Sequence, residues 1–265
     1  MKYILLLLCI FKLSANAQVL HFDTVACGID VADTSYINKM VRHEGQFYNQ
    51  VFGTHINDFL TVNVNLYGND RKYIRAVKAN NSKAFTNGLY LADINQCFVF
   101  KNDFYIHVIL HAASLNLLHN NYPTAPRWLT EGFATVMGYA DENGDREMTY
   151  TPLFDYNKQV QDLAWNRGQF GQEGIDFDAL FMDNNPDWDK RGGIANTNLR
   201  AMSYAVAYYL ITQDKSHLAP VLSAMKEGQT ATEAIASSYG SFDNFKDKFM
   251  LYYKYSAKSK FSAMN

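Results

Sequence analysis

The sequence predicts an α+β fold, because one helix precedes and several helices follow a region with strand-like alternation. Apolar residues recur with helical spacing over residues 33–52 and alternate with polar residues within 59–67 and 88–100. Helical spacing returns from residue 103 onward. This order of helix, sheet and helices favours α+β over a doubly wound fold. We expect a small N-terminal β-sheet, a pair of helices after it, and a helical C-terminal part.

The N-terminal part is predicted to hold one helix and the strands of the sheet. The helix covers residues 33–52, and Gly53 is suited to end it. Valine and leucine then alternate with polar residues in the strand-like region 59–67. A second strand-like region covers residues 88–100. Both regions are expected to lie in one sheet.

The next part of the chain is predicted to form two helices joined by a corner. The first covers residues 103–119 and stops at the Asn-Asn-Tyr-Pro segment. The second begins near Pro126, since proline is suited to a first helical turn. A short corner of this kind brings consecutive helices side by side.

The C-terminal third is predicted to be helical after a polar middle region that contains several glycines. Helical spacing of apolar residues covers 199–212 and 218–226. Thr230 and Glu233 match a capping box for a short helix, and Ser241 is suited to cap the last one.

The first residues have the pattern of a secretory signal peptide. Lys2 precedes the apolar segment 4–11, and small residues follow up to Ala17. The segment is too short to span a bilayer, and no later segment is apolar enough. We therefore expect a signal peptide over 1–17, a single domain over 18–265, no membrane span, and a secreted or periplasmic protein.

The charge pattern gives no reason to expect nucleic acid as a partner. The formal net charge is -2, and the charged residues form no long segments of one sign. Two cysteines follow the predicted signal peptide, Cys27 and Cys97. They are expected to form either one disulfide or two buried thiols, and both alternatives stay open.

A pair of histidines is the first candidate for chemistry. His107 and His111 are four residues apart, so both imidazoles lie on one helix face and can reach a single metal ion. Glu131 on the next helix is placed to supply a third ligand, which leaves zinc an open position for water. The alternative is a pair of hydrogen-bonded histidines on a buried helix.

The segment that contains Glu131 carries a family resemblance. Trp-Leu-Thr-Glu-Gly-Phe-Ala, residues 128–134, resembles the third-ligand segment of gluzincin metallopeptidases, the peptidase MA-like group. Further short segments that resemble the same family occur in the same order at residues 47–53, 88–90, 203–210 and 239–242. The resemblance implies a zincin-like fold with an active-site helix pair, zinc as the cofactor, and Glu131 as a metal ligand.

The family motif HExxH is incomplete in this chain, and two alignments with it are open. In the first alignment, His107 and His111 are the motif histidines and Glu131 is the third ligand. Val108 then occupies the position of the catalytic glutamate. This alignment keeps three zinc ligands and lacks the general base, because valine has no lone pair to accept a proton.

In the second alignment, His111 is the first motif histidine. Ala112 then stands in place of the catalytic glutamate, and Leu115 replaces the second histidine. Only His111 and Glu131 remain as ligands, so zinc is expected to bind poorly.

Two further residues are weak catalytic candidates. Asp103 lies one turn before His107 and is a candidate for a substitute base, although acidic residues at helix starts commonly interact with the helix dipole. Tyr204 resembles in position the residue that some gluzincins use to stabilise the oxyanion. Its other interpretation is an aromatic core residue of an apolar helix.

These observations lead to three functional hypotheses. The first is an inactive or impaired metallopeptidase homologue whose cleft binds a peptide, glycan or protein. The second is an active zinc metallopeptidase that uses His107, His111 and Glu131. The third is a structural module in which the cleft has no role.

Overall fold

The chain folds as an α+β protein, as the sequence predicts. The computed structural model describes residues 20–25, 29–80, 88–143, 147–165, 174–182, 185–189 and 194–256. The predicted signal peptide and Cys27 lie outside these residues. Cys97 is a buried free thiol, and burial raises its pKa. Within the described part of the chain, no helix is both long enough and apolar enough to cross a membrane.

The strands form a four-stranded sheet and a separate hairpin. The strands are β1 (Leu20–Val25), β2 (Val62–Tyr67), β3 (Gly88–Leu91), β4 (Gln96–Phe100), β5 (Ala140–Glu142) and β6 (Met148–Tyr150). The order in the larger sheet is β1-β2-β4-β3, in which β1, β2 and β4 are parallel and β3 is antiparallel to β4. β5 and β6 form the antiparallel hairpin. Strand β3 therefore lies at an edge of the larger sheet.

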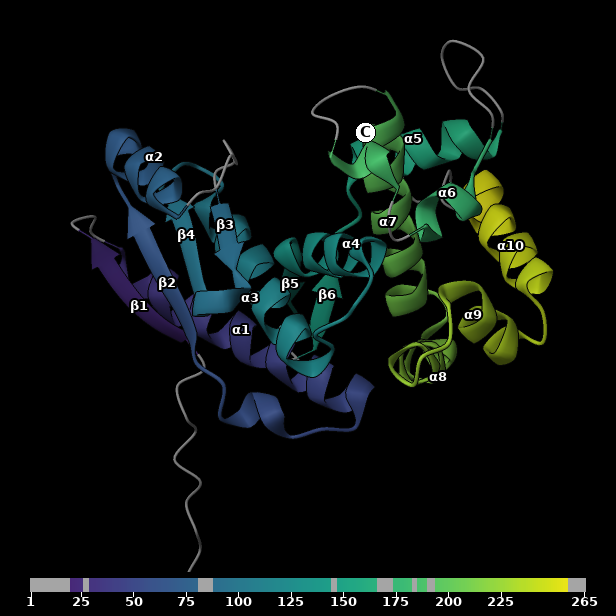
Figure 1. Ribbon diagram of the computed structural model, residues 1–265, viewed down its shortest axis with the longest axis horizontal. Coiled ribbons are helices and arrows are strands. Elements are labelled where there is room, and N and C mark those ends of the chain that lie inside the picture. Colours follow the sequence, from purple (N-terminus) through teal and green to yellow (C-terminus); the bar gives the residue numbers. More distant parts are fainter. Residues whose placement is uncertain are drawn as a thin grey trace, which may run out of the picture.

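Helices pack against the larger sheet and also form the C-terminal half of the molecule (Figure 1). They are α1 (Val31–Phe52), α2 (Asp70–Ala79), α3 (Tyr105–Asn121), α4 (Arg127–Gly138), α5 (Phe154–Ala164), α6 (Phe177–Phe181), α7 (Ile194–Thr212), α8 (Lys215–Lys226), α9 (Ala231–Tyr239) and α10 (Phe242–Leu251). Shorter turns are η1 (Ile56–Asp58), η2 (Ala92–Ile94), η3 (Pro186–Asp189) and the π-helical η4 (Tyr252–Ser256).

The two faces of the sheet are covered by different helices. Val64 and Cys97, which are paired across β2 and β4, belong to the main core with α1 and α3. Tyr67 and Phe98 belong to a smaller cluster with Tyr73 of α2. Successive side chains of a strand point to opposite faces, so this alternation fixes which helix covers which face.

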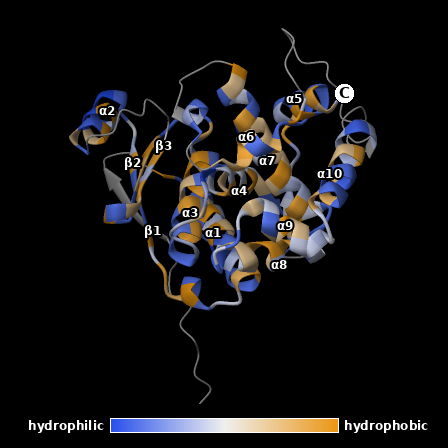
Figure 2. Ribbon diagram, turned by 45° about the vertical axis from the view of Figure 1, so that its right-hand side comes forward, coloured by the Kyte–Doolittle hydropathy of each residue, from blue (hydrophilic) through white to orange (hydrophobic). Residues whose placement is uncertain are grey.

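Helices α3, α4 and α7 form the centre of the molecule. Residues 201–211 of α7 are all buried, so this helix is apolar on every side rather than on one stripe. Figure 2 shows hydrophobic residues concentrated on these central helices and hydrophilic residues on outer ones such as α2 and α10. Helix α4 packs against both α3 and α7 and links the two halves of the molecule.

Several boundaries differ from the prediction for local reasons. The region 88–100 contains two antiparallel strands rather than one, because η2 and Asn95, which has a φ of 50°, reverse the chain. Helix α3 begins at Tyr105 rather than at Asp103. The polar middle region contains α5 and α6. The capping box at Thr230 and the Ser241 cap are confirmed.

Candidate functional site

Helices α3 and α4 approach closely at the residues that the sequence singles out. A Cβ atom on Gly138 of α4 would lie 3.1 Å from both the His107 carbonyl oxygen and the His111 Cβ. A larger residue at position 138 would push the helices apart, because such contacts are tighter than ordinary van der Waals distances. The absence of a side chain on Gly138 therefore sets the distance of α4 from the two histidines.

His107 is held at the C-terminal end of α4. Its Nδ1–H donates a hydrogen bond of 2.9 Å to the Gly138 carbonyl oxygen, and its ring stacks on Tyr139 with centroids 4.6 Å apart. Glu131 lies seven residues before Gly138 on the same helix, which is roughly 10 Å along the axis. His107 is thus anchored about two turns away from Glu131.

Glu131 instead forms an ion pair with an arginine of α7. Its Oε2 accepts a hydrogen bond from Arg200 Nη1 at 3.3 Å. The side chains are 26% and 43% exposed for Glu131 and Arg200, so the pair lies at an open surface. Exposed pairs of this kind contribute only about 0–1 kcal/mol to stability. The main consequence of the pair is therefore its effect on the charge around His111, rather than its contribution to the free energy of unfolding.

His111 lies within range of both members of this pair. Burial lowers the pKa of His111, the Glu131 carboxylate raises it, and the Arg200 guanidinium lowers it. A backbone hydrogen bond with Ala134 of α4 also raises this pKa. The structure therefore brings His111, Glu131 and Arg200 close together, and His107 lies further along the helix pair.

Arg200 is oriented by a buried asparagine. Its Nε donates to Asn196 Oδ1 at 3.0 Å. The Asn196 amide in turn donates to the carbonyl oxygens of Asp187 at 3.0 Å and Trp188 at 2.8 Å. These hydrogen bonds hold the Nε side of the guanidinium in place, so that Arg200 Nη1 faces Glu131.

The crossing of α4 and α7 depends on a second glycine. A Cβ atom on Gly132 would lie 2.3 Å from the Ser203 carbonyl oxygen, which is part of the α7 backbone. The Ser203 hydroxyl also donates to the Trp128 carbonyl oxygen at 2.9 Å. Because Glu131 and Gly132 are adjacent, the close crossing places the Glu131 carboxylate beside α7.

We expect Gly132→Ala to destabilise the protein by about 1–3 kcal/mol, because the two helix backbones must separate to admit the methyl group. Urea unfolding followed by circular dichroism measures this change. Gly228→Ala makes a useful comparison. A Cβ atom on Gly228 would meet no other atom within 4 Å, so Gly228→Ala creates no clash. Any stability that this variant loses comes from the φ of 102°, which disfavours alanine. Unchanged stability in Gly132→Ala would contradict the close crossing.

The residues present do not fit a zinc ion. Catalytic zinc takes three protein ligands, with a water in the fourth position. Within the described ranges, no group of three or more His, Cys, Asp or Glu side chains is arranged to hold a metal ion. His107, His111 and Glu131 lie within these ranges. The Glu131 carboxylate already has a cation beside it in Arg200.

The degenerate motif positions carry no proton acceptor. Val108 packs against the edge strand β3, where a Cβ on Gly88 would lie 2.3 Å from Val108 Cγ1. Ala112 is buried, and Leu115 is partly buried one turn after His111. None of the three side chains can take a proton from water.

The two weak catalytic candidates have different surroundings. Asp103 is exposed in the turn before α3, and Asn102 rather than Asp103 accepts a hydrogen bond from the Phe104 N–H at the helix start. Tyr204 is 1% exposed, and its hydroxyl accepts hydrogen bonds from Leu153 N at 2.9 Å and from Asn157 Nδ2 at 3.4 Å. Tyr204 is an aromatic core residue whose hydroxyl is used inside the fold.

Sequence reasoning did not find Arg200. Arg200 lies four positions before Tyr204, in a segment whose pattern predicts an apolar helix. No motif in the sequence includes Arg200. Its partner Glu131 is 69 residues away in sequence. The contact follows from the α4–α7 crossing, which no local pattern indicates.

Comparison with known proteins adds no further assignment to this site. The sequence matches no model of a known protein family, and a search of curated proteins gave no significant match.

Proposed function

We propose that the chain is an exported, zincin-like protein of the gluzincin type whose cleft has lost zinc and hydrolysis, and that the cleft binds a peptide segment. The observation that carries this proposal is the ion pair between Arg200 and Glu131 beside His111. Export would follow from the predicted signal peptide over residues 1–17.

A guanidinium beside Glu131 removes the reason for a metal at that carboxylate. In a zinc site the carboxylate shares the charge of the cation, and here Arg200 supplies a permanent positive charge. Bringing a divalent cation close to Arg200 adds electrostatic repulsion. The second alignment agrees with this arrangement, because it leaves His111 and Glu131 as the only motif ligands.

Hydrolysis also lacks its general base in either alignment. The motif position is Val108 in the first alignment and Ala112 in the second, and both side chains are aliphatic. Asp103 is exposed and lies before the first residue of α3. Without a base to accept the proton of an attacking water, a typical gain of about 10²–10⁴ in rate is lost.

A peptide is the ligand that the surroundings of the site favour. Strand β3 lies at the edge of the sheet and packs on α3, where Gly88 meets Val108. An extended peptide can add to such an edge as another strand. The Arg200 guanidinium is partly exposed and would pair with a carboxylate or carbonyl oxygen of the peptide. Tyr156 lies nearby, and its pKa is raised mainly by burial, with smaller effects from the charges of Arg200 and Glu131.

The test combines metal content, hydrolysis and binding. We expect protein purified without chelators to hold far less than one zinc per chain by mass spectrometry, and to leave fluorogenic casein peptides intact. The same labelled peptides are expected to bind saturably in fluorescence anisotropy. Arg200→Met should weaken that binding by about 10-fold, from the loss of a charge-assisted hydrogen bond.

Matched controls separate the alternatives. Arg71→Met removes an exposed arginine on α2, outside the cleft, and should leave binding unchanged. Stoichiometric zinc with peptide cleavage would overturn the proposal in favour of an active metallopeptidase that uses His107, His111 and Glu131. Absence of saturable peptide binding would also overturn it. In that case, binding of oligosaccharides would indicate a glycan ligand, and no binding would leave a structural module.

A further inference from the structure

A pocket separate from the His111, Glu131 and Arg200 site lies between α1, β6 and the start of α8. It is lined by α1, β6, the end of α7 and the start of α8, and its volume is about 530 Å³. Ile211 lines it at the C-terminal end of α7, whereas Arg200 lies eleven residues earlier, roughly 16 Å along the helix. The volume falls within the range of about 300–1,000 Å³ that is usual for small-molecule sites.

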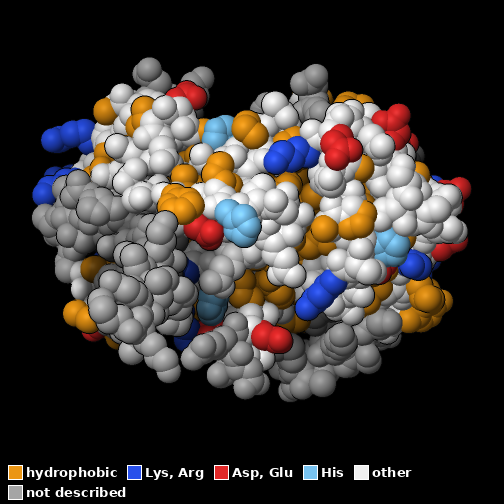
Figure 3. Space-filling view, turned by 90° about the horizontal axis from the view of Figure 1, so that it is seen from below, with side chains coloured by type: hydrophobic (Ala, Val, Ile, Leu, Met, Phe, Trp, Pro, Cys, Tyr) orange, Lys and Arg blue, Asp and Glu red, His pale blue; other side chains and the backbone are white. Residues whose placement is uncertain are grey.

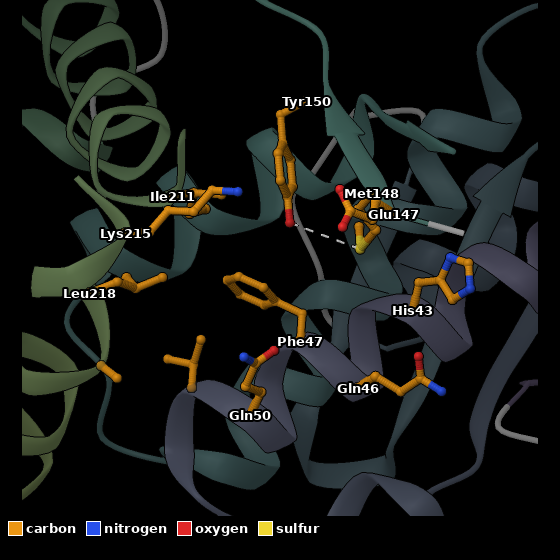
Figure 4. Close-up of a pocket in the computed structure, with 12 residues that line it drawn as sticks. His43, Gln46, Phe47, Gln50, Glu147, Met148, Tyr150, Ile211, Lys215 and Leu218 are labelled. Carbon is orange, nitrogen blue, oxygen red and sulfur yellow. Dashed lines mark hydrogen bonds between the residues drawn. The ribbon is translucent and has the colours of Figure 1, made fainter. Parts of the chain in front are cut away.

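The middle of the pocket is apolar. Phe47, Tyr150 and Leu218 approach one another from three different elements, and Ile211 lies behind Lys215 (Figure 4). Figure 3 views the molecule from the lower side of Figure 1, where α1 and α8 lie, and shows apolar side chains in the hollowed middle of that face with charged side chains around them. A ligand with an apolar body would remove this surface from water.

Two hydrogen-bond donors face the apolar middle without a strong partner. The Tyr150 hydroxyl points into the pocket, and its hydrogen bond goes to Met148 Sδ at 4.0 Å, a weak acceptor. Burial, with a further effect from the Glu44 carboxyl, raises the pKa of Tyr150, so the hydroxyl keeps its proton. The Lys215 amine extends toward the same region in Figure 4, and it forms no ion pair with any described residue.

The other end of the pocket has a different charge. Glu147 lies on the opposite side of Tyr150 from Lys215, next to Met148 and near His43 (Figure 4). A second anionic group on a ligand would be repelled there. The residues that line the pocket therefore favour a ligand with one anionic group near Lys215 and Tyr150 and an apolar body attached to it.

We propose that this pocket binds a small amphipathic monocarboxylate, with the carboxylate between Lys215 and Tyr150 and the apolar body between Phe47 and Leu218. The site is independent of the cleft proposed to bind peptides. A carboxylate accepts both donors at once, and charge-assisted hydrogen bonds of this kind are the stronger ones.

The test uses decanoate, with decanol as the uncharged probe of the same length. Isothermal titration of the full chain should show one decanoate site with a Kd on the order of 0.1–1 mM, as expected for about twelve heavy atoms. Lys215→Met should weaken decanoate binding by about 10-fold, and Tyr150→Phe by about 5-fold. Both variants should leave the weaker binding of decanol unchanged.

Two further variants make the outcomes decisive. Ala219→Trp fills the apolar part of the pocket and should weaken both probes, whereas Lys72→Met removes an exposed lysine on α2 and should affect neither. Circular dichroism confirms that each variant is folded. Decanol binding as tight as decanoate binding, or decanoate binding that Lys215→Met leaves unchanged, would overturn the proposal.

Discussion

Leu115→His combined with Arg200→Met is expected to create a zinc site in this protein. The new imidazole lies four residues after His111 on the same face of α3, and Glu131 is released from its ion pair to act as the third ligand. We expect a zinc Kd in the micromolar range or tighter, which corresponds to about −8 kcal/mol or better. Titration against a chromophoric zinc indicator measures it. Zinc should also raise the thermal midpoint of the double variant.

The controls test each part of this argument. Leu115→His alone keeps Arg200 and should bind zinc more weakly than the double variant. Leu115→Asn with Arg200→Met has the same released Glu131 but no new imidazole, so it should not bind zinc measurably. If the double variant binds zinc no better than this control, the second alignment is wrong and the resemblance to gluzincins loses its support at the site.

Hydrolysis would require one more change. Adding Ala112→Glu to the double variant places a carboxylate at the motif position for the general base, and weak peptide cleavage is expected. Ala112 is buried, so some loss of stability should accompany this change. Val108→Glu in the unmodified chain repairs the first alignment instead. Activity in that variant alone would mean that His107 and His111 are the true motif histidines.

Glu44→Gln is expected to stabilise the folded protein at neutral pH by about 1–3 kcal/mol. Glu44 is 0% exposed in α1, and neither carboxyl oxygen has a hydrogen-bond partner in the described part of the chain. Burial raises the pKa of Glu44 well above its ordinary value of 4.5. Above pH 4.5 the carboxyl must take up a proton or stay charged without a partner when the chain folds, and either costs stability, whereas an amide is neutral in both states at nearly constant volume.

The effect of Glu44 should depend on pH with a defined sign. Because the folded-state pKa is raised, the folded protein binds a proton that the unfolded chain releases above about pH 4.5. The free energy of unfolding contributed by this group is therefore fully present below pH 4.5 and falls as the pH rises toward the folded-state pKa. Glu44→Gln should remove this part of the pH dependence.

Urea unfolding of both proteins from pH 4 to pH 8 measures this difference. The gap between Glu44→Gln and the unmodified protein should widen as the pH rises. Glu142→Gln is a suitable control, because Glu142 is ion-paired with Lys39 and its loss should not stabilise the protein. A constant gap across this pH range would contradict a raised pKa for Glu44.

The sequence predicted elements well where local pattern and tertiary packing agree. The capping box at Thr230 and Glu233 and the cap at Ser241 are set by neighbouring residues, and both are present. Helix α2 lies between the predicted strand-like regions and is not predicted, because it is short and largely polar, with only Tyr73 and Val77 buried on it. Strand β1 was missed as well, and its place in the sheet comes from parallel pairing with β2, a contact distant in sequence.

The sequence by itself determined the α+β class, the helix pair, and the placement of His107, His111 and Glu131 on that pair, because apolar periodicity and caps act over a few residues. Tertiary structure alone decided which of these side chains lie close together. Gly138 sets the approach of α3 to α4, and Gly132 sets that of α4 to α7. The second approach brings Arg200 to Glu131, and such a contact depends on backbone distances between helices far apart in the chain, which no local pattern encodes.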